Sequence, residues 1–351
     1  MKAFEKNIRK VEPYVPGEQP QHKVIKLNTN ENPFPPAPGV TKALEEMDVS
    51  RLRLYPDPTV GPLVDELAKY YNVGSDQVFV GVGSDDVLAM CFLTFFNSEK
   101  PIFFPDITYS FYKVWAELYR IPYECQKLDD NFRIVKEDYY KENGGVIIAN
   151  PNAPTSLYAD LADIEDIIAN NQDVIVIIDE AYIDFAGKSA IELVDKYDNL
   201  IVVQTFSKAR SMAGMRIGYA ISNPILIKYL NDAKYSFNSY TMNQTSIICG
   251  VEAVKDKAYF EETVAKIVEI RDWSIGELRN LGFECMDSAA NFIFAKHPEY
   301  DAKELFTALK ENDIYVRFWG SKRIEQYMRI SVGTKEEMEA LLAFLRKHMN
   351  K

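Results

Sequence analysis

Short apolar runs alternate with segments of helical periodicity between residues 61 and 222. The segments 61–71, 85–96 and 161–171 repeat apolar residues with the period of a helix, so they are predicted helices. The apolar runs are predicted strands, at 77–83, 101–106, 144–151, 173–182, 199–208 and 216–222. Two of them, 174–179 and 200–204, are apolar on both faces, as is typical of central strands covered by helices. This alternation predicts a doubly wound α/β domain with a mostly parallel sheet.

The two ends of the chain have a different character. Residues 1–36 are rich in Pro and Asn, so we expect an extended arm that lies across a folded body. A long helical stretch at 245–281 is followed by short strands and helices, which predicts a smaller α+β domain. We therefore expect an arm (1–36) that completes the small domain, a large α/β domain (37–245) and a small C-terminal α+β domain (246–351).

Charge and composition narrow the classes of partner. The 351 residues include 40 Lys and Arg against 52 Asp and Glu, for a net charge of −12. An acidic chain without basic blocks is not suited to bind nucleic acid or an anionic membrane. No run approaches the ~18 apolar residues of a transmembrane helix. The four cysteines are scattered, which is typical of thiols in a reducing compartment. We expect a cytoplasmic protein that acts on small molecules.

A metal centre is not predicted. The three histidines are His22, His297 and His348, and they lie far apart without the His and Cys spacing of a zinc site. We expect no metal in the site.

Candidate functional residues follow the predicted strands. Ligands bind at the carboxyl ends of strands in an open parallel sheet, so residues just after each apolar run should gather in one site. These residues are Gly83, Ser84 and Asp85, then Tyr109, Asn152, Asp179 and Tyr182, and finally Thr205, Ser207, Lys208 and Arg216. Alone, each also fits an ordinary structural role, such as a surface lysine or a helix-capping aspartate. Together they predict a binding site for a phosphorylated carbonyl cofactor.

Lys208 is the candidate nucleophile. It directly follows a buried strand, where partial desolvation would lower its pKa and make a neutral amine available for a Schiff base. Asp179 also ends an apolar strand, where a carboxylate needs a cation such as a protonated pyridine nitrogen. Backbone N–H groups at Gly83–Asp85 and the Arg216 guanidinium suit a phosphate. Tyr109 fits an aromatic plate stacked on a heteroaromatic ring.

The motifs resemble a known family. NPNAPT (150–155), DEAY (179–182), SK (207–208) followed by Arg216, and MRISVG (328–333) resemble the fold-type I pyridoxal-phosphate aminotransferases. Within that family, the stretches EPYVPG, LNTNENPFPP, LYPD, GVGSDD and ITYSFY resemble the histidinol-phosphate aminotransferase branch. The resemblance extends over essentially the whole chain. It implies a fold-type I large domain, a small domain and an arm, with pyridoxal 5′-phosphate as cofactor.

The resemblance also implies roles for individual residues. Lys208 would hold the cofactor and then move the proton of the substrate, while Asp179 would pair with the pyridine nitrogen. Tyr109 would stack on the ring and Tyr182 would bind the phenolic oxygen. The residues implied to surround the phosphate are Gly83, Ser84, Asp85, Thr205, Ser207, Arg216 and, from a neighbouring copy of the chain, Tyr55. A shared site of this kind implies a homodimer.

The substrate pocket implied by the resemblance centres on Arg329. This side chain would bind the carboxylate of the amino-group acceptor and the phosphate of histidinol phosphate. Further candidates for the pocket are Arg317, Asn291, Tyr14 and Asn30. The implied reaction moves the amino group of L-histidinol phosphate to 2-oxoglutarate, giving imidazole-acetol phosphate and L-glutamate, in L-histidine biosynthesis.

The chain departs from the family pattern at two positions. Ala153 stands where the family has an Asn that contacts the phenolic oxygen, and Ser156 replaces a glycine. We hypothesise that Asn152, one residue earlier, takes over the contact by a small shift of the loop.

Other functions stay open at this point. An aminotransferase of the same fold for aromatic or other amino acids, and a threonine-phosphate decarboxylase, both fit the motifs. A nicotinamide-dependent dehydrogenase would use the partial G-x-G at 81–83 with Asp106 as the ribose-binding acid. A non-catalytic ligand-binding relative is disfavoured because Asp179, Lys208 and Arg216 are all present.

Overall fold

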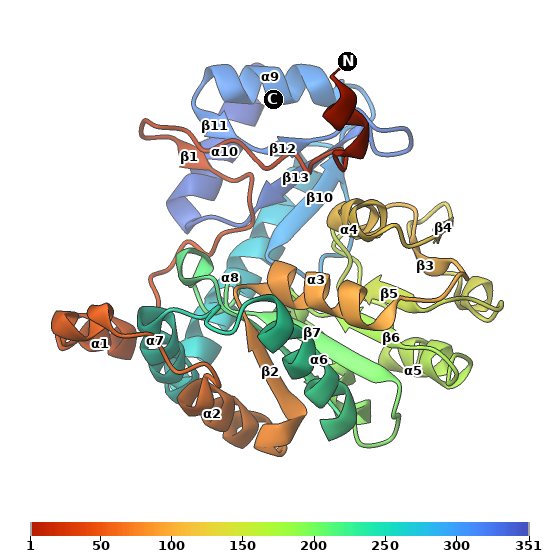
Figure 1. Ribbon diagram of the computed structural model, residues 1–351. Helices are drawn as coiled ribbons and strands as arrows, with labels where there is room; N and C mark the ends of the chain where they lie inside the picture. Colours follow the sequence, from red (N-terminus) through yellow and green to blue (C-terminus); the bar gives the residue numbers. More distant parts are fainter. Residues whose placement is uncertain (1, 350–351) are drawn as a thin grey trace.

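The computed structural model describes residues 2–349 and places a small domain above a large one (Figure 1). The arm crosses the small domain, and both ends of the chain lie there (Figure 1). Among the described residues, none of the helices combines the length and the hydrophobicity needed to cross a membrane.

The large domain is built on a mixed sheet of seven strands. They are β2 (Val78–Gly81), β3 (Ile102–Pro105), β4 (Tyr123–Gln126), β5 (Val146–Ala149), β6 (Val176–Asp179), β7 (Leu200–Thr205) and β8 (Gly218–Ser222). The spatial order is β2-β8-β7-β6-β5-β3-β4. Strand β8 runs antiparallel to both of its neighbours, β2 and β7, and the remaining pairs are parallel. The predicted mostly parallel sheet is confirmed.

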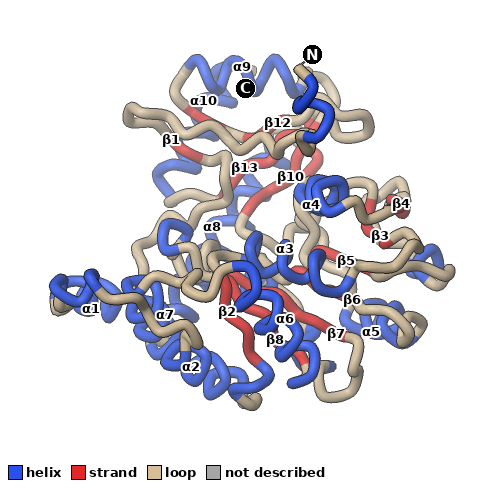
Figure 2. The backbone as a smooth tube through the Cα atoms, in the orientation of Figure 1, coloured by secondary structure: helices blue, strands red, loops and turns tan. Residues whose placement is uncertain are grey.

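Helices cover both faces of this sheet because successive strand residues point to opposite sides. Val176 and Ile178 pack with α2 (Gly61–Tyr71), α5 (Leu161–Ala169) and α7 (Gln244–Lys255). Ile177 packs on the other face, with α3 (Ser84–Phe95), α4 (Phe111–Tyr119) and α6 (Pro224–Phe237). Figure 2 shows the strands enclosed between these helices. The doubly wound architecture therefore follows from strands that are apolar on both faces.

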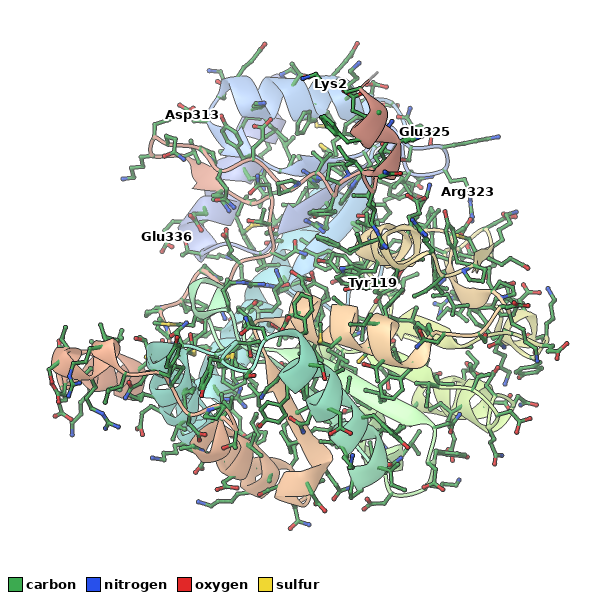
Figure 3. All side chains as sticks on the ribbon, viewed as in Figure 1. Lys2, Tyr119, Asp313, Arg323, Glu325 and Glu336 are labelled. Atoms are coloured by element: carbon green, nitrogen blue, oxygen red, sulfur yellow. The ribbon has the colours of Figure 1, made fainter. Side chains whose placement is uncertain are left out.

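The small domain follows the long helix α8 (Lys257–Asn280). Its antiparallel sheet has the order β12-β13-β10-β9, formed by Arg317–Phe318, Tyr327–Ser331, Phe292–Lys296 and Glu284–Cys285. The helices α9 (Ala302–Glu311) and α10 (Lys335–His348) pack in the same core. In the arm, β1 (Ile25–Lys26) pairs in parallel with β11 (Ile314–Tyr315). His22 of the arm also contacts Asp313, and Figure 3 labels Asp313 in the small domain.

The segment that connects the two domains contains two helices where the sequence predicts one. The predicted helix 245–281 is two helices, because α7 ends at Lys255 and Asp256 caps α8 by accepting from the Tyr259 N–H. Helix α7 packs with α1 (Pro38–Glu45) and α2 in the core of the large domain. The apolar face of α7 is therefore buried in the core of the large domain.

Candidate active site

A cavity of about 520 Å³ lies where the large domain, the small domain and the arm meet. Its walls come from the carboxyl ends of β3, β5, β6 and β7, the start of α3, the arm and the segment from β12 to β13. Most sequence-predicted residues line it: Tyr14, Asn30, Ser84, Asp85, Tyr109, Asp179, Tyr182, Thr205, Ser207, Lys208, Arg216, Arg317 and Arg329. The topology thus brings residues from distant parts of the chain into one site.

Lys208 lies three residues beyond the end of β7 and lines the cavity. Its Nζ donates to the Thr29 carbonyl oxygen of the arm at 3.0 Å. Burial and, to a smaller extent, the Arg329 guanidinium lower its pKa to about 8, against the opposing effect of Glu31. A substantial fraction of this amine is therefore neutral near pH 8, as a nucleophile requires.

Asp179 ends β6 and is buried at the inner wall of the cavity. The Tyr112 hydroxyl donates to its Oδ2 at 2.7 Å, and the Ala181 N–H donates to Oδ1 at 3.3 Å. Burial raises the pKa of Asp179 to about 6, although the Tyr112 hydroxyl opposes this rise. A cation at Oδ1 would compensate the desolvated carboxylate.

Two tyrosines with buried hydroxyls line the same space. Tyr109 donates to Asp85 Oδ1 at 2.8 Å, and burial raises its pKa well above the ordinary value. The Tyr182 hydroxyl accepts from Asn30 Nδ2 at 2.9 Å, and burial raises its pKa as well. Both rings therefore present neutral hydroxyls held in place by single polar partners.

An anion site forms where α3 begins. Its first N–H groups are free of helical partners, and the helix dipole favours negative charge there. Gly83 has φ +85°, and a Cβ built on it would lie 2.4 Å from Arg216 Nη2. Arg216 Nη1 donates to Ser207 Oγ at 3.4 Å, and the Thr205 hydroxyl donates to the same oxygen at 3.0 Å. A guanidinium, two hydroxyls and free amides together suit a phosphate.

A second cationic region belongs to the small domain. Arg329 on β13 donates to the Asn28 carbonyl oxygen at 2.9 Å. Its Nε is buried and has no hydrogen-bond partner within residues 2–349. The Arg329 guanidinium lies 5.1 Å from the Trp319 ring, and the Arg317 guanidinium lies 5.4 Å from it. An orphaned guanidinium N–H beside a second arginine suits an anionic group of a ligand.

Some predicted residues lie outside the cavity lining. Asn291 is buried and donates to the Asn30 carbonyl oxygen at 3.0 Å, so it holds the arm. Asn152 uses its amide on Thr108, on the Ile107 carbonyl and on Thr155. Ala153 lines the cavity and Asn152 does not. The hypothesised contact of Asn152 with the cofactor stays a prediction.

Tyr55 also lies outside the cavity lining. Its side chain is 81% exposed and stacks on Tyr240 with ring centroids 4.6 Å apart. It does not line the cavity of its own chain.

Sequence reasoning missed Tyr112, Trp319 and the Thr29 carbonyl. Tyr112 follows Tyr109 by three positions, a spacing that places both on one side of a helical turn. Trp319 follows Arg317 by two positions, so both point to the same face of an extended strand. Those two spacings were available signals. The contact of Lys208 with the Thr29 carbonyl has no sequence signal, because every residue has a backbone carbonyl.

In the dehydrogenase alternative, Asp106 would bind a ribose, but its carboxylate has other partners in the structure. Asp106 binds Arg323 at 2.8 Å and accepts from the Leu128 N–H at 3.0 Å. Figure 3 shows Arg323 at the boundary between the two domains. Asp106 is thus committed to joining them. Within the part of the chain that the structure describes, no group of three His, Cys, Asp or Glu side chains is arranged to hold a metal ion.

Comparisons with known proteins identify the family. The model of the family "Aminotransferase class I and II" matches residues 22–345. A histidinol-phosphate aminotransferase from Brachyspira hyodysenteriae is 51% identical, with 97% of each chain covered. One from Clostridium botulinum (strain Okra / Type B1) is 48% identical, with 100% of each covered.

A solved structure is similar in fold. The histidinol-phosphate aminotransferase from Sinorhizobium meliloti, in complex with pyridoxal-5′-phosphate, gives a TM-score of 0.82 at 24% identity, over 92% of this chain and 91% of that one. With a family match that spans most of the sequence, this chain belongs to the class I and II aminotransferases.

Proposed function

We propose that this protein is a pyridoxal-phosphate-dependent aminotransferase that moves the amino group of L-histidinol phosphate to 2-oxoglutarate. The observation that carries the proposal is the position of Lys208 between two cationic regions. Arg216 of the large domain and Arg329 of the small domain both lower the pKa of its amine. One region suits the phosphate of a cofactor, and the other suits the anionic end of a substrate.

The residues present fit pyridoxal phosphate. The start of α3, Ser207 and Arg216 would hold its phosphate, and Asp179 Oδ1 would meet the ring nitrogen. Tyr109 would lie against the ring, and the Tyr182 hydroxyl would reach the phenolic oxygen. When bound, the cofactor supplies an electron sink for charge that develops at the substrate's α-carbon.

The chain's own residues then do the remaining work. Lys208 holds the cofactor, and its amine, once free, moves the proton at the substrate's reacting carbon. Its lowered pKa matches this task, because a base must be neutral before it accepts a proton. Arg329 and Arg317 hold the phosphate of one substrate and the carboxylate of the other. A single site that serves both substrates in turn gives ping-pong kinetics.

We also propose a homodimer with shared sites. Large apolar side chains are exposed on the connection before α2 and at the end of α6, where Tyr55 and Tyr240 stack. They are Val49, Leu52, Leu54, Tyr55, Phe237 and Tyr240. Exposed apolar groups gathered in this way mark an interface. In such a dimer, Tyr55 of the second copy would reach the phosphate, as the resemblance to the family implies.

The test is the visible spectrum of the purified protein with bound pyridoxal phosphate. Added histidinol phosphate should convert the cofactor to pyridoxamine phosphate, and 2-oxoglutarate should reverse the change. Lys208→Ala should fold normally and lose turnover. A faster reaction with phenylalanine would favour an aromatic aminotransferase. Release of carbon dioxide from threonine phosphate without a keto acid would favour the decarboxylase. A spectrum unchanged by any of these amines would refute the proposal.

A further inference from the structure

Tyr112 is a buried polar residue that the proposed mechanism does not yet use. It lies on α4, is 0% exposed and does not line the cavity, so its hydroxyl does not meet a ligand there. The hydroxyl nevertheless donates to Asp179 Oδ2 at 2.7 Å. This short bond to a carboxylate of the site is the observation from which the inference starts.

The Tyr112 hydroxyl is held in place by the packing of its ring. Phe104, Phe92 and Trp115 surround it, with ring centroids 6.0, 6.4 and 6.4 Å away. Tyr109 meets it edge-on, at a centroid distance of 5.7 Å. Because close-packed aromatic rings leave little room for another rotamer, the hydroxyl is fixed before any ligand arrives.

The two carboxylate oxygens of Asp179 have different partners. Oδ2 is taken by Tyr112, whereas Oδ1 has a long contact of 3.3 Å with the Ala181 N–H. Since the carboxylate lines the cavity and Tyr112 does not, Oδ1 is the atom left for a ligand. A hydrogen bond from a neutral hydroxyl also favours the ionised carboxylate over the protonated one.

Burial and one neighbouring charge oppose the ionisation of Asp179. Asp85 on α3 is a negative charge that raises its pKa, and burial raises it more. The hydroxyls of Tyr109 and Tyr182, which also sense the charge of Asp179, are neutral. Tyr112 and the Ala181 N–H therefore supply the local donation that keeps the carboxylate charged.

We propose that Tyr112 is a positioning residue that keeps Asp179 ionised and directs its Oδ1 to the ring nitrogen of the cofactor. The inference rests on the proposed function, because it assumes that a pyridine ring binds there. Tyr112 acts through Asp179 and touches neither the cofactor nor a substrate.

Binding of 4′-deoxypyridoxine 5′-phosphate to the cofactor-free protein tests this role. The analogue keeps the ring nitrogen and the phosphate but lacks the aldehyde, so Lys208 makes no covalent bond to it. Calorimetric titration between pH 5 and 8 would compare wild type with Tyr112→Phe. The matched control is Tyr139→Phe, because Tyr139 is another buried tyrosine and its hydroxyl has no partner among the described residues.

We expect Tyr112→Phe to weaken binding ~10- to 100-fold, the effect of a lost hydrogen bond to a charged group. Below the pKa of Asp179, a proton must leave the carboxyl before it can pair with a protonated ring nitrogen. Affinity should therefore decrease as pH falls through about 6 in wild type. The same decrease should begin at higher pH in Tyr112→Phe, because loss of the donor raises the pKa of Asp179. Tyr139→Phe should match wild type in both respects.

The outcomes separate this inference from the proposed function. Wild type that fails to bind the analogue would refute the proposed cofactor, and the inference with it. Wild-type binding together with an unshifted pH profile in Tyr112→Phe would refute the inference alone, even if affinity fell uniformly. A double-mutant cycle gives a second measure, because Tyr112→Phe should cost less in an Asp179→Asn background, where there is no carboxylate charge to maintain. An undiminished cost in that background would overturn the role.

Discussion

Replacement of Gly83 by Ala tests how the anion site is assembled. Gly83 precedes α3 with φ +85° and ψ 162°, a region that side chains with a Cβ almost never adopt. The new Cβ would also lie 2.4 Å from Arg216 Nη2 and 2.9 Å from Arg216 Cζ. One methyl group therefore strains the backbone and displaces the guanidinium that we assign to the phosphate.

The magnitude follows from these two effects. Backbone strain of this kind costs about 1–3 kcal/mol of folding free energy. The guanidinium must retreat from 2.4 Å to at least 3.4 Å to reach ordinary contact, which would break its 3.4 Å bond to Ser207. A charge-assisted hydrogen bond lost from the phosphate should weaken cofactor binding by ~1.5–3 kcal/mol, or roughly 10- to 100-fold.

The assay combines thermal unfolding of the cofactor-free protein with titration of pyridoxal phosphate. Gly276→Ala is the control, because Gly276 lies inside α8 and its new Cβ would meet no described atom within 4 Å apart from the neighbouring backbone of its own helix. We expect that control to gain roughly 0.5–1 kcal/mol, as helix propensity predicts. If Gly83→Ala bound the cofactor and unfolded like wild type, the assignment of Arg216 and the α3 terminus to the phosphate would be wrong.

Two further predictions concern Lys208 and the dimer. Borohydride trapping of pyridoxal phosphate on the cofactor-free protein should rise with pH to half its maximum near pH 8, because only the neutral Lys208 amine reacts. The midpoint should move upward in Arg329→Gln, which removes a cation that lowers this pKa; a midpoint near 10.5 in wild type would contradict the reasoning. Tyr55→Ala should bind the cofactor more weakly, but mixing it with inactive Lys208→Ala should restore activity in hybrid dimers, where one site has both residues intact. No recovery on mixing would argue against shared sites.

Much of the fold could be predicted from the chain's periodicity. The runs that became β6 and β7 were apolar on both faces, so a buried parallel sheet was the arrangement that fits them. The division of the predicted helix 245–281 into α7 and α8 could not be found in this way, because both are helical and differ in what they pack against. Likewise, the sequence around α4 does not indicate that the Tyr112 hydroxyl contacts Asp179.

The sequence by itself determined which chemical groups stand at the strand ends, because a parallel sheet collects its carboxyl ends at one edge. Lys208, Asp179 and Arg216 could therefore be assigned to one site before any distance was known. Only the tertiary structure decided the partners of those groups. Tyr112 on Asp179 and the Thr29 carbonyl on Lys208 are contacts across 67 and 179 residues of chain. Such contacts depend on how helix, arm and sheet pack, and local patterns of hydrophobic and polar residues do not encode that packing.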